Sequence, residues 1–243
     1  MSAVMQAAQH ERQRLGEAVA EMVRRDADMP APGLVRLAPR LLTPSDRAAA
    51  LYALRILLAV TGGVRHLPDA ERSAELFDRL ATDQHGRATL SRCVADRRAS
   101  GLYLYRELRD LPVLALDGRE TIWDGRFRIS GDTGWIVRPA EAGDPAIGPA
   151  PDGVPQSIVR AALATQPVVL PASMYATGER FAGAEARRSG LGAGTSAVPK
   201  PILAPWNLFL PDFDLAPASA IARLIGAPSP PPSPFTGHKD ISA

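Results

Sequence analysis

Proline is distributed very unevenly along this chain. Seventeen of the 23 prolines lie in residues 139–243, where they and ten glycines make up 27 of 105 residues. Proline lacks an amide hydrogen and glycine has a permissive backbone, so both interrupt helices and strands. The chain therefore divides near Pro139 into an ordered first part and a Pro/Gly-rich, partly disordered second part dominated by loops.

Three short segments of residues 139–243 can still form regular structure. Ser157–Thr165 and Pro217–Ile225 each allow two helical turns, and Pro167–Leu170 a short strand, all isolated between breakers. The last stretch, Pro228–Ala243, contains a run of three prolines and reads as a polyproline-like tail.

Residues 1–85 are predicted to form a helical unit. Apolar residues recur every three to four positions over Ala3–Asp26, and Met29–Gly33 ends that helix. A third helix is predicted over Pro68–Thr82, which has acidic residues in its first turn and a glycine beyond its end.

The second helix has distinct start and stop signals. Thr43 can cap its amino end, Pro44 suits the first helical position, and Asp46 favours the first turn. Leucines spaced three and four apart form its buried face, and the Gly62-Gly63 pair closes it.

Residues 86–138 change to strand-forming sequence. We expect a hairpin of Thr89–Ala95 with Leu102–Arg106 around a basic loop, Asp96–Gly101. A second hairpin is expected between Val113–Leu116 and Thr121–Ile129 around Asp117-Gly118, with Trp135–Val137 as an edge strand. Helices followed by antiparallel strands predict an α+β fold, with a small antiparallel β unit at 86–138.

Composition excludes several classes of protein. Cys93 is the only cysteine, which rules out an intramolecular disulfide and a cysteine-based zinc cluster. No run approaches the roughly 18 apolar residues that a membrane helix needs, and the first residues lack the pattern of a signal peptide. We therefore expect a cytoplasmic protein without a membrane partner.

Several candidate sites are better explained without function. The glycine run within Ser189–Ser196 neither follows a strand nor opens a helix, so a phosphate loop is not favoured. No two histidines have metal-ligand spacing, Cys93 is a packed thiol, and the pair Asp212 and Asp214 is a loop cap. No catalytic, cofactor or metal residue is assigned. The four histidines are His10, His66, His85 and His238.

Arginine is the remaining signal. Of 28 basic residues 26 are arginines, and residues 86–138 hold ten arginines against seven acidic residues. Arg126 and Arg128 are two apart in a predicted strand and should project from one face. A solvated sheet face in an arginine-rich proteome is the favoured explanation of this pattern when it is taken alone, and binding of a nucleic acid is the alternative. The candidate RNA-binding residues are Arg87, Arg92, Arg97, Arg98, Arg106, Arg126 and Arg128.

Ordered pieces of residues 45–130 resemble a known family. They include Ala53–Leu58, Val60–Gly63, His66–Pro68, Gly101–Leu104 and Trp123–Phe127. In this order and spacing they are similar to the C-terminal region of bacterial tRNA(Ile)-lysidine synthetases.

Two departures from the family pattern stand out. Ser91-Arg92-Cys93 occupies a place where the family pattern has Gly-Gly-Cys, which adds a charge and changes the local backbone requirement. The family's ATP-pyrophosphatase loop, of the form Ser-Gly-Gly-x-Asp-Ser, does not occur in the 243 residues.

The resemblance implies a function for the chain. The family enzyme uses ATP and Mg to join lysine to the wobble cytidine of an isoleucine tRNA, and its C-terminal region holds the tRNA. This chain would then bind tRNA, lack the ATP-binding chemistry by itself, and depend on a separate catalytic ATP-pyrophosphatase domain. The alternative is a nonenzymatic interaction module whose tail, Pro228–Pro234, docks into a partner's groove.

Overall fold

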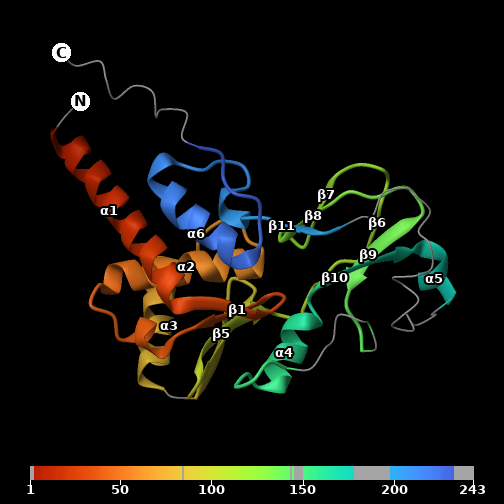
Figure 1. The fold of residues 1–243 in the computed structure, drawn as a ribbon, viewed down its shortest axis with the longest axis horizontal. Helices are drawn as coiled ribbons and strands as arrows, with labels where there is room; N and C mark the ends of the chain where they lie inside the picture. Colours follow the sequence, from red (N-terminus) through yellow and green to blue (C-terminus); the bar gives the residue numbers. More distant parts are fainter. Residues whose placement is uncertain (1–2, 84, 143, 145–149, 178–197, 233–243) are drawn as a thin grey trace, which may run out of the picture.

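The computed structural model describes residues 3–83, 85–142, 144, 150–177 and 198–232. They form helices and antiparallel sheets, which confirms the predicted α+β class (Figure 1). The helices are α1 Ala3–Asp26, α2 Arg47–Gly62, α3 Ala70–Thr82, α4 Gln156–Leu163, α5 Ala172–Thr177 and α6 Leu215–Ile225, with short 3-10 helices η1 Pro39–Leu42, η2 Ala204–Trp206 and η3 Asp212–Asp214. The strands are β1 Ala27–Ala31, β2 Leu34–Leu37, β3 Gly86–Leu90, β4 Cys93–Arg98, β5 Gly101–Arg106, β6 Leu114–Ala115, β7 Thr121–Trp123, β8 Phe127–Ile129, β9 Trp135–Pro139, β10 Pro167–Pro171 and β11 Lys200–Pro201.

The largest sheet joins strands from two distant parts of the chain. Its order is β1-β2-β5-β4-β3, and every neighbouring pair is antiparallel. The main hydrophobic core lies between one face of this sheet and α1, α2, α3 and α6. Helix α4 packs on the opposite face, where it covers Leu34, Val94, Tyr103 and Tyr105. The sheet is therefore the middle layer between helices.

Two smaller sheets lie beside this body, toward the right of Figure 1. Their strand orders are β10-β9-β6 and β11-β8-β7. Leu116, Trp123, Ile129 and Val137 form a third core between them, and the indole nitrogen of Trp123 donates to the Pro112 carbonyl over 2.9 Å.

The hairpin of β1 and β2 was not predicted from the sequence. Met29–Gly33 does end the first helix, but it does so by starting a strand that joins the large sheet. Pro30 is tolerated because β1 is an edge strand, and Gly33, at φ 71°, makes the turn. The buried Leu34 and Leu37 then anchor β2 against β5.

Helix α2 begins later than its start signals indicate. The carboxylate of Asp46 accepts a hydrogen bond from the Ala49 amide over 2.9 Å, so Asp46 is the cap and Thr43 is not. Thr43 instead ends η1, where its amide donates to the Arg40 carbonyl. The predicted closing glycine is confirmed, because Gly63 adopts the left-handed conformation at the carboxyl end.

The first predicted hairpin is a three-stranded meander. Thr89–Ala95 is not one strand, because the chain reverses at Ser91 and Arg92 between β3 and β4. These two residues have φ of 52° and 61°, the left-handed conformation that a two-residue type I′ turn requires. Strand β4 then continues through Arg98 to pair with β5, so the expected basic loop is shorter than predicted.

The second predicted hairpin pairs differently from the expectation. Strand β6 pairs with β9, whereas β7 and β8 pair with each other around Asp124 and Gly125. Strand β9 is the central strand of its sheet, and the prediction that Trp135–Val137 forms an edge was wrong. The Asp124-Gly125 pair has the sequence that type I′ turns favour, so it competes with Asp117-Gly118 as the turn.

The described residues after Pro139 are more regular than expected. Helices α4 and α6 and strand β10 confirm the three predicted segments, and they pack on the rest of the fold instead of being isolated. No loop-dominated part is found in these residues. The glycine run and the last part of the tail lie in 178–197 and 233–243, outside the described residues. Among the described helices, none has the length and apolar character needed to cross a bilayer.

Candidate nucleic-acid interface

The structure does not bring the seven candidate arginines onto one face. It divides them among three places. Three surround Asp124, three lie at one end of the large sheet, and Arg128 lies on the sheet formed by β11, β8 and β7. The first group is Arg92, Arg106 and Arg126, and the second is Arg87, Arg97 and Arg98.

Asp124 is held at a junction of three backbone segments. It lies in the β7–β8 turn, where Asp124 and Gly125 have φ of 53° and 70°. This turn and the Ser91-Arg92 turn both abut the end of α2 so closely that a Cβ on Gly62 or Gly63 would clash with their backbone. Glycine at the end of α2 is therefore required by close approach.

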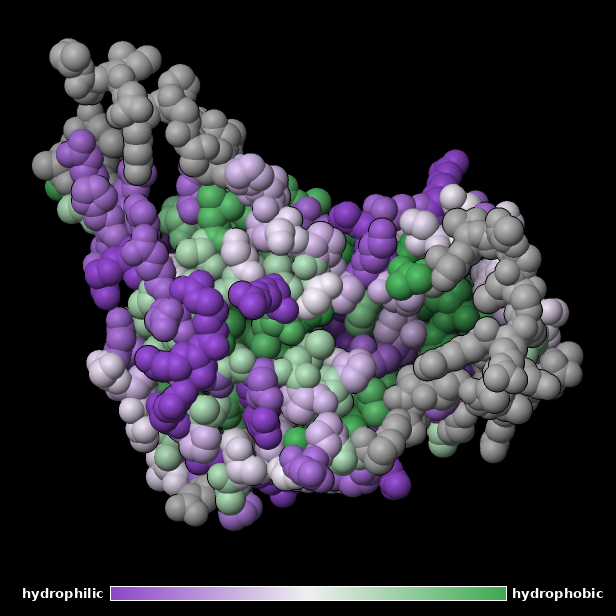
Figure 2. All heavy atoms as spheres, viewed as in Figure 1, coloured by the Kyte–Doolittle hydropathy of each residue, from purple (hydrophilic) through white to green (hydrophobic). Residues whose placement is uncertain are grey.

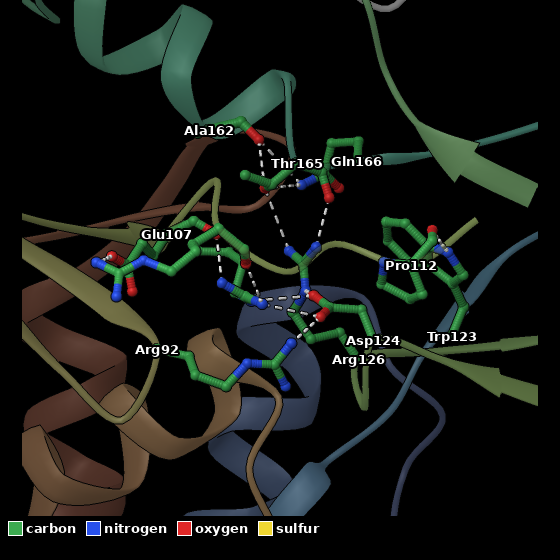
Figure 3. A network of polar contacts seen from close by, with 11 residues as sticks. Arg92, Glu107, Pro112, Trp123, Asp124, Arg126, Ala162, Thr165 and Gln166 are labelled. Atoms are coloured by element: carbon green, nitrogen blue, oxygen red, sulfur yellow. Dashed lines mark hydrogen bonds and ion pairs between the residues drawn. The ribbon is translucent and has the colours of Figure 1, made fainter.

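Three guanidinium groups converge on the Asp124 carboxylate (Figure 3). Arg106 donates to both of its oxygens, each over 3.1 Å, and Arg126 Nε donates to Oδ2 over 2.7 Å. Arg92 reaches Oδ1 from the β3–β4 turn. We call these four residues the Asp124 cluster.

The remaining donors of the cluster are used by the backbone. Arg106 also donates to the carbonyls of Glu107 and Arg109, the latter over 3.1 Å. Arg126 donates to the Thr165 carbonyl and to its hydroxyl, the latter over 3.3 Å, at the end of α4. The cluster thus connects β3–β4, β5, β7–β8 and the α4–β10 connection.

Burial separates this cluster from a ligand-binding surface. Arg106 is 1 % exposed and Arg126 is 6 % exposed. Burial lowers the pKa of Arg126 to about 10, so the guanidinium remains charged at neutral pH. Arg126 therefore does not project beside Arg128 as predicted, because it follows the turn and precedes β8, where strand alternation does not apply.

A row of polar residues crosses all five strands of the large sheet. Cross-strand register places Asp28, Arg36, Tyr103, Asp96 and Arg87 opposite one another in that order. Cross-strand partners share a face, so the row lies on the face that α4 partly covers. Arg36 is satisfied by Asp28, with bonds of 2.9 and 2.6 Å, whereas Arg87 is exposed at the far edge.

Arg97 and Arg98 end strand β4 instead of occupying a loop. Arg98 pairs with the buried Asp96 over 2.6 Å, which ties its guanidinium to the sheet. Arg97 donates to the Arg98 carbonyl and is in no ion pair with another described residue. Arg87, which lies 5.9 Å from the Tyr105 ring, is likewise in no ion pair with a described residue. At this end of the sheet, the exposed Arg87 and the half-buried Arg97 are therefore the two arginines that no described carboxylate neutralises.

The residues interpreted as structural have structural surroundings. Cys93 is fully buried and burial raises the pKa of its thiol, so the packed-thiol interpretation is confirmed. The prediction that the Asp214 side chain acts as a cap was wrong: its carboxylate makes no cap hydrogen bond and instead accepts from the Tyr52 hydroxyl over 2.8 Å and from the Trp206 indole over 3.1 Å. Among the described residues, no group of His, Cys, Asp and Glu is placed to hold a metal ion.

Two contributors to these sites were not singled out from the sequence. The signal for Asp124 is the sequence Asp124-Gly125-Arg126, a turn-forming Asp-Gly pair followed directly by an arginine. Lys200 carries no local signal, because its position opposite Arg128 arises only when β11 pairs with β8.

Comparison with known proteins identifies relatives over almost the whole chain. The chain is 44% identical over 236 residues to a tRNA(Ile)-lysidine synthase of Mesorhizobium japonicum, covering 94% of this chain and 49% of that protein. The chain is homologous to part of tRNA(Ile)-lysidine synthase. A second protein of that name, from Rhizobium meliloti, is 34% identical over 186 residues, which cover 74% of this chain and 38% of that protein.

The chain spans about half the length, or less, of the curated relatives it matches. No protein-family model matches the chain, and no solved structure matches it significantly. The homology confirms the family resemblance that the sequence pieces indicated.

Proposed function

We propose that this chain is a tRNA-binding portion of a tRNA(Ile)-lysidine synthase-like ligase. The observation that carries the proposal is the relationship to a tRNA(Ile)-lysidine synthase over 94% of the chain. The relative's name describes an activity on an isoleucine tRNA, so isoleucine tRNA is the partner that follows for this chain.

The described surface offers cations suited to an RNA backbone. Arg87 is exposed and Arg97 is half-buried at the same end of the large sheet, and neither has a carboxylate partner among the described residues. Folded RNA is recognised largely through its shape, phosphates and 2′-hydroxyls, which such cations can contact. The Asp124 cluster lies at the opposite end of β4, where Arg106 and Arg126 use their donors within the protein, so these two buried arginines are not part of this surface.

The ligase chemistry of the family is proposed to depend on residues outside this sequence. No Ser-Gly-Gly-x-Asp-Ser segment occurs in the 243 residues. The described residues also offer no cluster of carboxylates for Mg. No chemical step is therefore assigned to these residues. The chain alone is expected to be inactive, with a separate ATP-pyrophosphatase domain as its partner.

Filter binding of unmodified isoleucine tRNA over a salt series tests the proposal. We expect binding at low salt that weakens steeply as salt rises, because phosphate contacts release counterions. A matched control is Arg24→Ala, which removes an exposed arginine paired with Glu21 on α1 and should leave affinity unchanged. Absence of binding at low salt, or an affinity that does not respond to salt, would contradict the proposal.

A further inference from the structure

Two neighbouring apolar side chains are unusually exposed after η2. Leu208 is 76 % exposed and Phe209 is 75 % exposed, although both are large. They lie on one wall of an open groove of about 350 Å³, and the segment Ala227–Pro231 forms another wall. Figure 2 shows hydrophobic side chains reaching the surface around α6, from which this second wall continues. An exposed adjacent pair of this size calls for an occupant.

The groove combines apolar walls with a cation. Trp206 and Phe209 contribute aromatic rings, and Arg128 contributes a guanidinium. None of the lining residues is an aspartate or a glutamate. The volume falls at the lower end of the roughly 300–1,000 Å³ that ligand sites occupy.

A second cation stands directly beside Arg128. Cross-strand register places Lys200 of β11 opposite Arg128 of β8, so both side chains are on the same face of the sheet. Like charges in directly opposed positions repel each other, and a bound anion relieves that repulsion. Arg128 has partial compensation, since Glu120 lies 3.2 Å from Nε and Asn207 accepts from Nη2 over 3.3 Å.

We propose that this groove binds one unpaired nucleotide of an RNA. The base stacks on Phe209 between the apolar walls, and the phosphate lies at Arg128 and Lys200. Stacking on an aromatic ring together with a cation for the backbone is how proteins bind unpaired nucleotides. The inference rests on the proposed function and adds a specific contact to it: an unpaired nucleotide in this groove, in addition to the backbone contacts proposed at Arg87 and Arg97.

A protein segment or a second copy of this chain would also cover apolar side chains. An apolar protein segment would leave the two opposed cations, Arg128 and Lys200, without an added anion. The observations therefore favour a nucleotide, and the other occupants become outcomes of the test.

The test uses the full chain, unmodified isoleucine tRNA and four single variants. Phe209→Ala should weaken binding about tenfold, as expected for loss of one stacked base, and Phe209→Tyr should retain affinity because it keeps the ring. Tyr175→Ala, which removes an exposed ring from α5, is the control and should change affinity less than twofold. Lys200→Ala should make the salt dependence shallower by about one ion.

A crosslink identifies the contacted nucleotide. Benzoyl-phenylalanine placed at position 209 should crosslink to the tRNA at an unpaired position, mapped by reverse transcription. Equal affinity of Phe209→Ala and the wild type, or a crosslink only to paired nucleotides, overturns the groove and leaves the proposed function standing. If the wild type itself does not bind the tRNA, the proposed function and the groove are both overturned.

Oligomeric state separates the remaining explanation. Light scattering of the wild type and Phe209→Ala should give the same mass at all concentrations. A wild-type dimer that Phe209→Ala converts to a monomer, with unchanged RNA affinity, would assign the groove to contact between copies and overturn the nucleotide site.

Discussion

Two groups of arginines in this fold have opposite surroundings. In the Asp124 cluster, buried guanidinium groups converge on one carboxylate and on backbone carbonyls. At the end of the large sheet, Arg87 and Arg97 extend without a carboxylate among the described residues. The same residue type therefore stabilises the fold in one place and is available to a ligand in the other, and the neighbouring backbone determines which.

The largest expected effect comes from removing the shared carboxylate. Asp124→Ala should lower the free energy of unfolding by about 3–5 kcal/mol, because it leaves buried guanidinium groups without their anion. Urea unfolding measures this difference. Asp117→Ala is a matched control, since Asp117 also precedes a glycine in a turn but is exposed, and we expect it to cost under about 1 kcal/mol. Similar losses in both variants would show that the cluster has no special role.

Replacing one arginine of each group by methionine compares the stability that a buried and an exposed arginine contribute. Arg106→Met should cost about 2–4 kcal/mol, because it removes two hydrogen bonds from the buried Asp124 carboxylate. Arg87→Met should change stability by less than about 0.5 kcal/mol, since Arg87 is exposed. Thermal unfolding of the two variants at one pH gives the contrast. If Arg106→Met is as stable as Arg87→Met, the hydrogen bonds of Arg106 make no special contribution to the stability of the fold.

Asp26 provides an intermediate case, a buried carboxylate paired with exposed arginines. Burial favours a raised pKa for Asp26, but hydrogen bonds from Arg25 and Arg40 outweigh it and hold its pKa below the usual value for an aspartate. A lowered pKa contributes stability above the unfolded value that is lost as pH falls through the folded value. Asp26→Asn should therefore cost about 1–2 kcal/mol at pH 7 and progressively less below about pH 4. Urea unfolding from pH 7 to pH 3 measures this; a difference that is constant with pH would be inconsistent with an ionised Asp26.

The smallest effect on stability should accompany a clear effect on RNA. Arg87→Ala combined with Arg97→Ala should weaken tRNA binding several-fold and make the salt dependence shallower by about one to two ions, with stability within about 0.5 kcal/mol of the wild type. Arg98 is left intact because it neutralises the buried Asp96. Filter binding and urea unfolding of the same preparation measure the two effects. Unchanged tRNA affinity in the double variant would show that Arg87 and Arg97 do not bind the tRNA.

Much of the fold was accessible from local sequence. Apolar periodicity and terminal residues predict α1, α3 and the carboxyl end of α2. Short patterns between prolines predict α4, β10 and α6. The start of α2 was misplaced because Thr43 and Asp46 both have cap chemistry, and only the preceding η1 decides between them.

Strand pairing could not be predicted from local sequence, even for a hairpin of neighbouring strands. The turn at Ser91 and Arg92 lacks the Asn-Gly or Gly-Gly sequence that indicates a type I′ turn, and so the β3–β4 hairpin was read as one strand. The family pattern has Gly-Gly at this place, which suits the left-handed backbone that the turn adopts. Local sequence also does not show that Arg92, Arg106 and Arg126 gather at Asp124, because Asp124 lies 32 residues from Arg92 in the chain.

The packing of α1 against α6 has a consequence for synthesis. These two helices come from opposite ends of the described residues, yet they share the main core, and Gly16 of α1 lies directly against the Phe213 backbone beside α6. A ribosome adds about 5–20 residues per second, so the apolar stripe of α1 waits on the order of ten seconds or longer for its partner to emerge. Until α6 emerges, the nascent chain cannot complete the part of its core that α1 and α6 share.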